Sequence, residues 1–467
     1  MSEAKFLDGS LMRHVVVMST TASLGLMAVF LVDFIDMIFI SMLGQAELAA
    51  AIGYAGAILF FTTSISIGLA IAAGAVVSRA LGAGEDDRAR MLSSHAMAAG
   101  VALATVFAAI VWLSLEPLTQ LVGAEGETQQ LAIGYLAVII PSMPILAIGM
   151  IGGAILRAHG DAGRAMTATL AGGAVNAVLD PIFIFGLGLD LTGAAMATVA
   201  ARFAIMGASL YPIFRHHGGF APVHAKALIA DIRQISAIAF PAMATNVATP
   251  ISTAYVTREM AVFGEAAVAG MAIISRLVPV TFAVVFALSG AIGPIVGQNY
   301  GAGRFDRVRR AFYDSVLFTG LYVLFAALIL FVLRGPLVAL FNAEGEALTL
   351  IYLFCGPLAL AWFFNGVIFI SNAAFNNLGH PLHATAINWG RHTIGTVPPV
   401  MLGAALLGPA GVLIGQAVGG VVFAAIAWWM MLRLVAQAEA AGEQQERRER
   451  PHFSRRARLV QLFEHRR

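Results

Sequence analysis

The chain consists largely of apolar stretches that are long enough to cross a lipid bilayer as helices. The first runs from Val15 to Leu43, and its only charged residues are Asp33 and Asp36. A transmembrane helix needs about 20 mostly apolar residues, whereas a membrane barrel is built from shorter segments in which apolar and polar residues alternate. We therefore expect an all-α polytopic membrane protein with twelve transmembrane helices. The expected spans are 15–41, 48–73, 91–114, 129–155, 165–188, 191–213, 235–257, 266–292, 311–333, 347–374, 384–407 and 410–433.

The composition agrees with a membrane protein and excludes other classes. Hydrophobic residues make up 59% of the chain and charged residues 12%, against about 45–50% and about 25% in soluble domains. The single cysteine, Cys355, excludes disulfides and thiolate metal sites. The net charge of +2 gives no reason to expect nucleic acid as a partner. The first apolar stretch is too long for a signal core, so we expect no cleaved signal peptide.

Basic residues are distributed unevenly over the loops between the spans. If the N-terminus lies in the cytoplasm, the opposite loops hold only Arg258 and Arg334, beside several glutamates. Such a bias is the positive-inside pattern, so we expect both termini in the cytoplasm and a location in a bacterial-type inner membrane. The cytoplasmic loops hold the remaining basic residues, Arg79, Arg88, Arg90, Arg157, Arg164, Arg215, Lys226, Arg233, Arg304, Arg307, Arg309 and Arg310.

The sequence contains an internal repeat. "LGAGEDDRAR" at 81–90 matches "YGAGRFDRVR" at 300–309, and "GAEGE" at 123–127 matches "NAEGE" at 342–346, both with the same offset along the chain. Each unit holds six spans, and an even number predicts two parallel, pseudo-symmetric six-helix bundles. We expect a cytoplasmic N-terminus (1–14), an N-terminal lobe (15–213), a cytoplasmic linker (214–234), a C-terminal lobe (235–433) and a basic cytoplasmic tail (434–467).

Two pseudo-symmetric bundles are typical of transporters that expose a midplane site to either side of the membrane in turn. The sequence lacks the enzyme motifs H-E-x-x-H and G-x-S-x-G, and the ATP-binding motif G-x-x-x-x-G-K-[ST]. We therefore predict a secondary active transporter, not an enzyme, with no cofactor and an H⁺ or Na⁺ gradient as its energy source. The two G-A-G-x-x-D-R-x-R loops are interpreted as turn and topology signals.

The fifth span carries the strongest candidate for an ion site. Asn176 and Asp180 are four residues apart, so they share one helix face. Pro181 lacks a backbone N–H, and its ring displaces the carbonyl group of Ala177. Oxygen groups of this kind hold Na⁺ at membrane depth, and Asp180 alone can bind H⁺. A buried, neutral, hydrogen-bonded Asp180 is the structural alternative. We expect no metal other than Na⁺ at this site.

Three residues on other spans extend this candidate site. Asp36 on the first span lies at nearly the same depth as Asp180 when residues are counted from the outer ends of their spans. Two carboxylates that face one cavity favour sharing a proton or a cation. Thr198 on the sixth span adds a hydroxyl group, and Asp33 is an accessory candidate that could instead face water.

Several segments resemble the multidrug and toxic compound extrusion (MATE) family. They are "VDFIDMIFISMLGQAELAA" (32–50), "GGAVNAVLDPIFIFGLGLDLTGAAMATV" (172–199) and "GQNYGAGRFDRVRRA" (297–311), and the resemblance runs from about residue 12 to residue 433. It implies a two-lobe antiporter of the flippase-related superfamily that exports organic, often cationic, compounds in exchange for H⁺ or Na⁺. In the branch with a cation site in the N-terminal lobe, the implicated positions fall on Asp36, Asn176, Asp180 and Thr198.

Two alternatives to export remain open at this stage. A lipid-linked precursor flippase on the same superfold would need a large cationic cavity, for which Arg202, Arg276 and Arg391 are the only candidates. Interhelical pairing or snorkelling is the preferred interpretation of these three arginines. A receptor without transport activity ranks last because the polar residues within the spans are intact. The expected partners are a small-molecule substrate and membrane lipid, with no obligate protein partner and a monomeric state.

Overall fold

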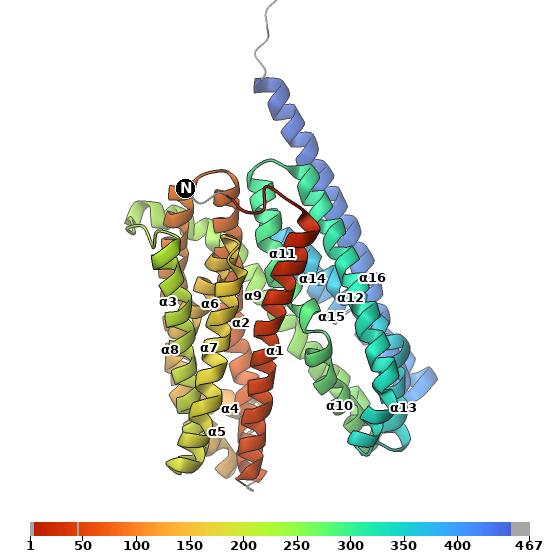
Figure 1. Ribbon diagram of the computed structural model, residues 1–467. Helices are drawn as coiled ribbons and strands as arrows, with labels where there is room; N and C mark the ends of the chain where they lie inside the picture. The colour runs from red at the N-terminus through yellow and green to blue at the C-terminus, as the bar shows by residue number, and fades with distance from the viewer. Residues whose placement is uncertain (1–3, 44–45, 450–467) are drawn as a thin grey trace, which may run out of the picture.

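The computed structural model describes residues 4–43 and 46–449, and within these ranges the chain is helical with no strand. The N-terminal lobe is built from the helices of residues 11–216 (Figure 1). They are α1 Leu11–Met42, α2 Ala46–Gly82, α3 Asp86–Leu113, α4 Leu115–Leu121, α5 Gly126–Ile139, the 3₁₀ turn η1 Ile140–Ser142, α6 Met143–Ala158, α7 Ala162–Pro181, the π-helical turn η2 Ile182–Gly186 and α8 Asp190–His216.

The C-terminal lobe repeats this arrangement. Its first helix begins at Ala225, before the expected residue 235, because the charged second half of the linker continues the helix beyond the apolar span. The elements are α9 Ala225–Ala261, α10 Glu265–Thr281, α11 Ala283–Gly301, α12 Phe305–Leu340, α13 Gly345–Leu353, the π-helical turn η3 Phe354–Leu358, α14 Trp362–Asn377, α15 Pro381–His392 and α16 Val397–Glu449. The predicted tail beyond residue 449 lies outside the described residues.

The expected twelve spans agree with this architecture. In the described part of the chain, ten helices are long and apolar enough to cross a membrane, and the bent pair of α13 and α14 adds an eleventh. The turn at Gly408 divides α16, because the backbone there has φ 60° and ψ −142°, which only glycine adopts easily. A Cβ at Gly411 would lie 1.9 Å from the carbonyl oxygen of Gly403, and one at Gly419 would lie 1.6 Å from that of Gly395. The helical segments before and after Gly408 are therefore antiparallel, and their glycines let them pack closely. Counting these two segments as separate spans gives the twelfth span.

The repeated G-A-G loops end α2 and α11 in the same way. Gly84 and Gly303 have φ values of +76° and +70°. The N–H of Glu85 donates to the carbonyl of Ala80, and the N–H of Arg304 donates to that of Asn299, at 3.0 and 2.9 Å. This is the hydrogen-bond pattern of a helix that ends at a left-handed glycine. The interpretation of these loops as turn signals is confirmed.

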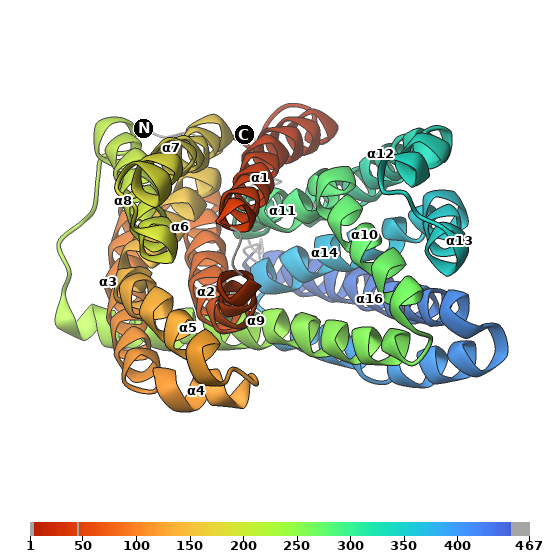
Figure 2. The same ribbon diagram turned by 90° about the horizontal axis from the view of Figure 1, so that it is seen from below.

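The two lobes lie close together at the end that carries the N-terminus and diverge toward the other end (Figure 1). Seen from the diverging end, α1 lies between α7 of its own lobe and α11 of the other lobe (Figure 2). The N-terminal segment joins both lobes at the closed end, because Lys5 donates to the carbonyl of Gly160 and the N–H of Phe6 donates to Gln298 Oε1, at 2.9 and 2.8 Å.

The closed end is held by a pseudo-symmetric contact between α2 and α11. A Cβ at Gly82 would lie 2.0 Å from the carbonyl oxygen of Gln298, and one at Gly301 would lie 2.1 Å from that of Arg79. Gly82 corresponds to Gly301 in the internal repeat and Arg79 to Gln298, so each lobe presents a glycine to the same backbone position of the other. Glycine is needed at both positions because any side chain would separate the helices.

Candidate functional site

The candidate ion site lies where α1 packs on α7. The side-chain amide of Asn176 donates to both oxygens of Asp36, at 3.2 and 3.3 Å, and to Oδ2 of Asp180 at 2.5 Å. One amide thus joins the two carboxyl groups, which lie close enough to interact. The depth count and the four-residue spacing predicted this contact, and the structure brings these three side chains together.

The buried trio has more hydrogen-bond acceptors and negative charge than its neighbours can satisfy. Asp180 is fully buried and Asn176 is 6% exposed, whereas Asp36 is half-buried. Asp180 Oδ1 has no hydrogen-bond partner among the described residues. A buried acceptor without a donor is costly, and two adjacent carboxylates repel each other. A single proton or small cation bound between Asp36 and Asp180 would relieve both penalties.

Pro181 shapes the backbone next to this pair. α7 ends at Pro181 and continues into the π-helical turn η2, where the wider turn accommodates the missing N–H. The turn packs tightly on α8, because a Cβ at Gly193 would lie 2.7 Å from the backbone carbon of Phe183. Ala177 is half-buried, one turn before Pro181. The local break therefore fixes α8 against the end of α7 that carries Asp180.

Thr198 and Asp33 lie near the trio, but no hydrogen bond joins them to it among the described residues. Thr198 donates to the carbonyl of Ala194 at 3.0 Å. Asp33 is exposed, almost one turn from Asp36 on α1. Sequence reasoning missed Tyr135 on α5, whose phenol lies beside Thr198 and faces the acidic pair. A lone tyrosine in an apolar span, whose hydroxyl needs a polar partner, was the available signal.

Two of the arginines within spans make interhelical contacts, as predicted. Arg202 is 7% exposed and donates to the carbonyl of Ile139 at 3.1 Å and to Ser142 Oγ at 2.8 Å. Arg391 at the end of α15 donates to the side-chain oxygen of Asn365 on α14. Both guanidinium groups therefore have polar partners within their own lobe.

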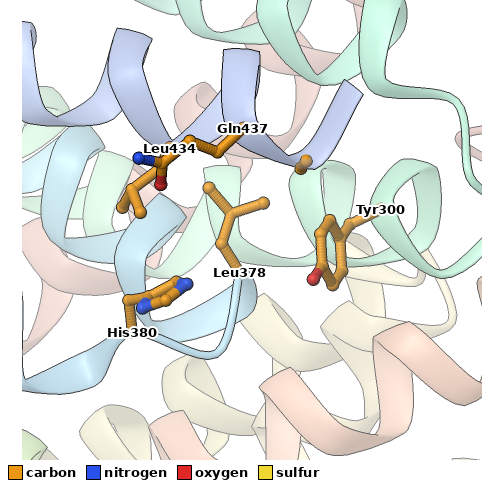
Figure 3. A pocket seen from close by; sticks show the side chains of 6 residues that line it. Tyr300, Leu378, His380, Leu434 and Gln437 are labelled. Carbon is orange, nitrogen blue, oxygen red and sulfur yellow. The ribbon is translucent and has the colours of Figure 1, made fainter. Parts of the chain in front are cut away.

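Other parts of the described chain offer no comparable site. No group of three or more His, Cys, Asp or Glu side chains there could hold a metal ion. A small cavity of about 210 Å³ lies in the C-terminal lobe, and Figure 3 shows the side chains that line it. It is lined by Tyr300, Leu378, His380, Leu434, Gln437 and Ala438, none of which belongs to the predicted site.

The family model MatE matches residues 22–182 and again residues 241–400. The starts of the two matches, 22 and 241, are related by the offset of the internal repeat. An FAD transporter of Shewanella oneidensis is 27% identical over 91% of this chain and 95% of its own length. The multidrug export protein MepA of Staphylococcus haemolyticus is 24% identical over 92% and 95%. A crystal structure of a mutant of the Vibrio cholerae MATE transporter VcmN superposes with a TM-score of 0.87 and 26% identity over 91% and 97%.

Proposed function

The chain belongs to the MatE family of multi-pass membrane transporters, and from this premise we propose that it exports small amphipathic organic compounds in exchange for H⁺ or Na⁺. The observation that carries the proposal is the Asn176-bridged carboxyl pair of Asp36 and Asp180. In this proposal the pair binds the coupling ion, Tyr135 and Thr198 border it, and Ala177 and Pro181 shape the backbone around it.

Exchange requires that the ion and the substrate favour opposite states of the protein. The lobes are joined at the end where α2 and α11 meet at Gly82 and Gly301, which is the cytoplasmic end in the proposed orientation. An inward-facing state must separate these helices. Because a ligand shifts an equilibrium only by its differential affinity for the two states, we propose that the ion and the substrate compete.

The named relatives bear on the substrate class. One is an FAD transporter and another a multidrug export protein, so both names describe transport of organic molecules. These names favour export of organic molecules over the alternative of a lipid-linked precursor flippase. We propose further that the protein acts as a monomer in a bacterial-type inner membrane, in contact with lipid and with both termini in the cytoplasm.

Transport in proteoliposomes tests the assignment. An imposed pH or Na⁺ gradient should drive movement of a fluorescent dye by the parent protein, measured with and without Na⁺ at fixed pH. We expect Asp36→Asn and Asp180→Asn to abolish the dye transport that the ion gradient drives. Asp87→Asn is the matched control, because Asp87 is an exposed acid on the cytoplasmic side. Unchanged coupled transport in both site variants would show that the ion binds elsewhere.

A further inference from the structure

Arg157 points in an unusual direction for its place in the chain. It precedes the last residue of α6, at the cytoplasmic end, where an arginine normally turns toward water and lipid head groups. Its Nε lies 3.8 Å from the Cβ position of Gly290 on α11. Gly290 precedes Gly301, the cytoplasmic end of α11, by eleven residues. At about 1.5 Å per residue, Gly290 therefore lies about 16 Å along α11 from the end at which the two lobes meet.

The guanidinium group of Arg157 has no partner in residues 4–43 and 46–449. It takes part in none of the hydrogen bonds or ion pairs there, and no charged side chain lies close enough to act on it. Arg202 and Arg391, by contrast, both donate to oxygens of neighbouring elements. An arginine within a membrane-spanning region is a candidate for binding a group of opposite charge, and the half-buried guanidinium of Arg157 is free to do so.

Arg157 and its neighbours on α11 are partly accessible, since Arg157 itself is half-buried. α11 is packed by α1, α2, α12 and α14, yet its Ser289, next to Gly290, is exposed. Arg276 on α10 is also exposed and reaches the sulfur of Met37 on α1 at 3.2 Å. The boundary between the lobes thus carries positive charge from both lobes, Arg157 on α6 and Arg276 on α10, whereas the acidic pair lies between α1 and α7.

Aromatic side chains line the same boundary one turn above Gly290. The ring of Phe286 lies 5.5 Å from that of Trp362, 5.6 Å from that of Phe369 and, across the boundary, 6.4 Å from that of Phe30. Four residues of helix separate Phe286 from Gly290, which is about 6 Å. Half-buried rings at this spacing form a surface on which a planar ring system can stack.

We propose that Arg157 binds the anionic group of the transported compound, while the aromatic part of that compound packs on Phe286, Trp362 and Phe369. The substrate class is therefore a planar aromatic molecule with a carboxylate, sulfonate or phosphate group. A guanidinium binds such groups through two parallel hydrogen bonds. The inference rests on the proposed export function, and it departs from the cationic substrates that the sequence favoured.

Two dyes with the same ring skeleton and opposite charge test the proposal. Fluorescein and rhodamine 123 share a xanthene ring, and their binding to the protein in lipid nanodiscs can be measured by fluorescence polarisation, with empty nanodiscs subtracted. We expect Arg157→Gln to weaken fluorescein binding at least tenfold and to leave rhodamine 123 binding unchanged or stronger. Arg157→Lys keeps the charge and should retain part of the fluorescein affinity. Arg215→Gln, on the exposed cytoplasmic surface, should behave like the parent.

A second variant distinguishes loss of the guanidinium group from misfolding of Arg157→Gln. Gly290→Leu keeps the charge of Arg157 and places a side chain in front of it, so it should also reduce fluorescein binding. Equal fluorescein affinity in the parent and both variants would overturn the proposal, as would a parent that binds only rhodamine 123. The measurement uses no ion gradient, so a failure of coupling at Asp36 and Asp180 would leave its result intact.

Discussion

The contact between α2 and α11 predicts how a single methyl group shifts the protein between its two states. In the structure, a Cβ at Gly82 would lie 2.0 Å from the carbonyl oxygen of Gln298, whereas real Cβ atoms stay at least 3.0 Å from such atoms. Gly82→Ala therefore forces α2 and α11 apart at the closed end by about 1 Å. Overpacking of this kind costs about 1–3 kcal/mol, which corresponds to a population shift of about 5- to 150-fold toward the inward-open state.

Cysteine labelling from the cytoplasmic side measures this shift. Ser78 is fully buried at the contact, where it donates to Asn377 Oδ1 at 3.2 Å, so Ser78→Cys in a Cys355→Ala background reports opening. We expect Gly82→Ala to raise the labelling rate at least fivefold. Gly163→Ala, in the first turn of α7 with no atom near its Cβ position, is the matched control. Equal labelling rates in the two variants would refute the assignment of this contact as the closed gate.

Two further predictions concern stability. Burial alone would raise the pKa of Asp161, but hydrogen bonds from His217 and Arg164 outweigh it and hold the pKa below its usual range. The carboxylate therefore stabilises the fold above the unfolded pKa of about 4, and this stabilisation is lost as the pH falls toward the folded pKa. Asp161→Asn should lower the free energy of unfolding at pH 7 by less than about 1 kcal/mol, measured as a lower melting temperature. The difference in melting temperature between variant and parent should shrink below about pH 4. A difference that stays constant with pH would contradict this prediction. Gly411→Leu should prevent packing of the last two spans, so we expect loss of the monodisperse peak in size-exclusion chromatography, whereas Gly207→Leu, with open space at its Cβ, should keep it.

Much of the fold follows from the sequence because membranes impose a simple pattern. The turn between the last two expected spans fell at Gly408, where the chain does reverse. The constant offset between the repeated motifs predicted two equivalent lobes. The two matches to the family model start at positions separated by the same offset. The contact of Asp36 with the Asn176 and Asp180 face was predictable because depth along a span follows from residue counting.

Other features depend on how the two lobes pack, which no local pattern encodes. Arg157 was counted among the cytoplasmic basic residues, and its chain position gives no sign that its side chain extends toward Gly290. The glycines of the repeated loops were interpreted as turn signals, and Gly84 and Gly303 have this role. Gly82 and Gly301 serve a second purpose, contact between lobes, that only the assembled structure reveals.

The central claim is that an ion bound between Asp36 and Asp180 competes with the substrate. The most direct test is the affinity for pyrene tetrasulfonate, a planar aromatic anion whose charge is constant near neutral pH, measured while H⁺ and Na⁺ concentrations are varied separately. We predict that the parent binds the dye more weakly as the coupling ion rises, and that the Asp36→Asn/Asp180→Asn variant binds it with an affinity that neither ion changes. The same ion dependence in the variant and the parent would contradict the account.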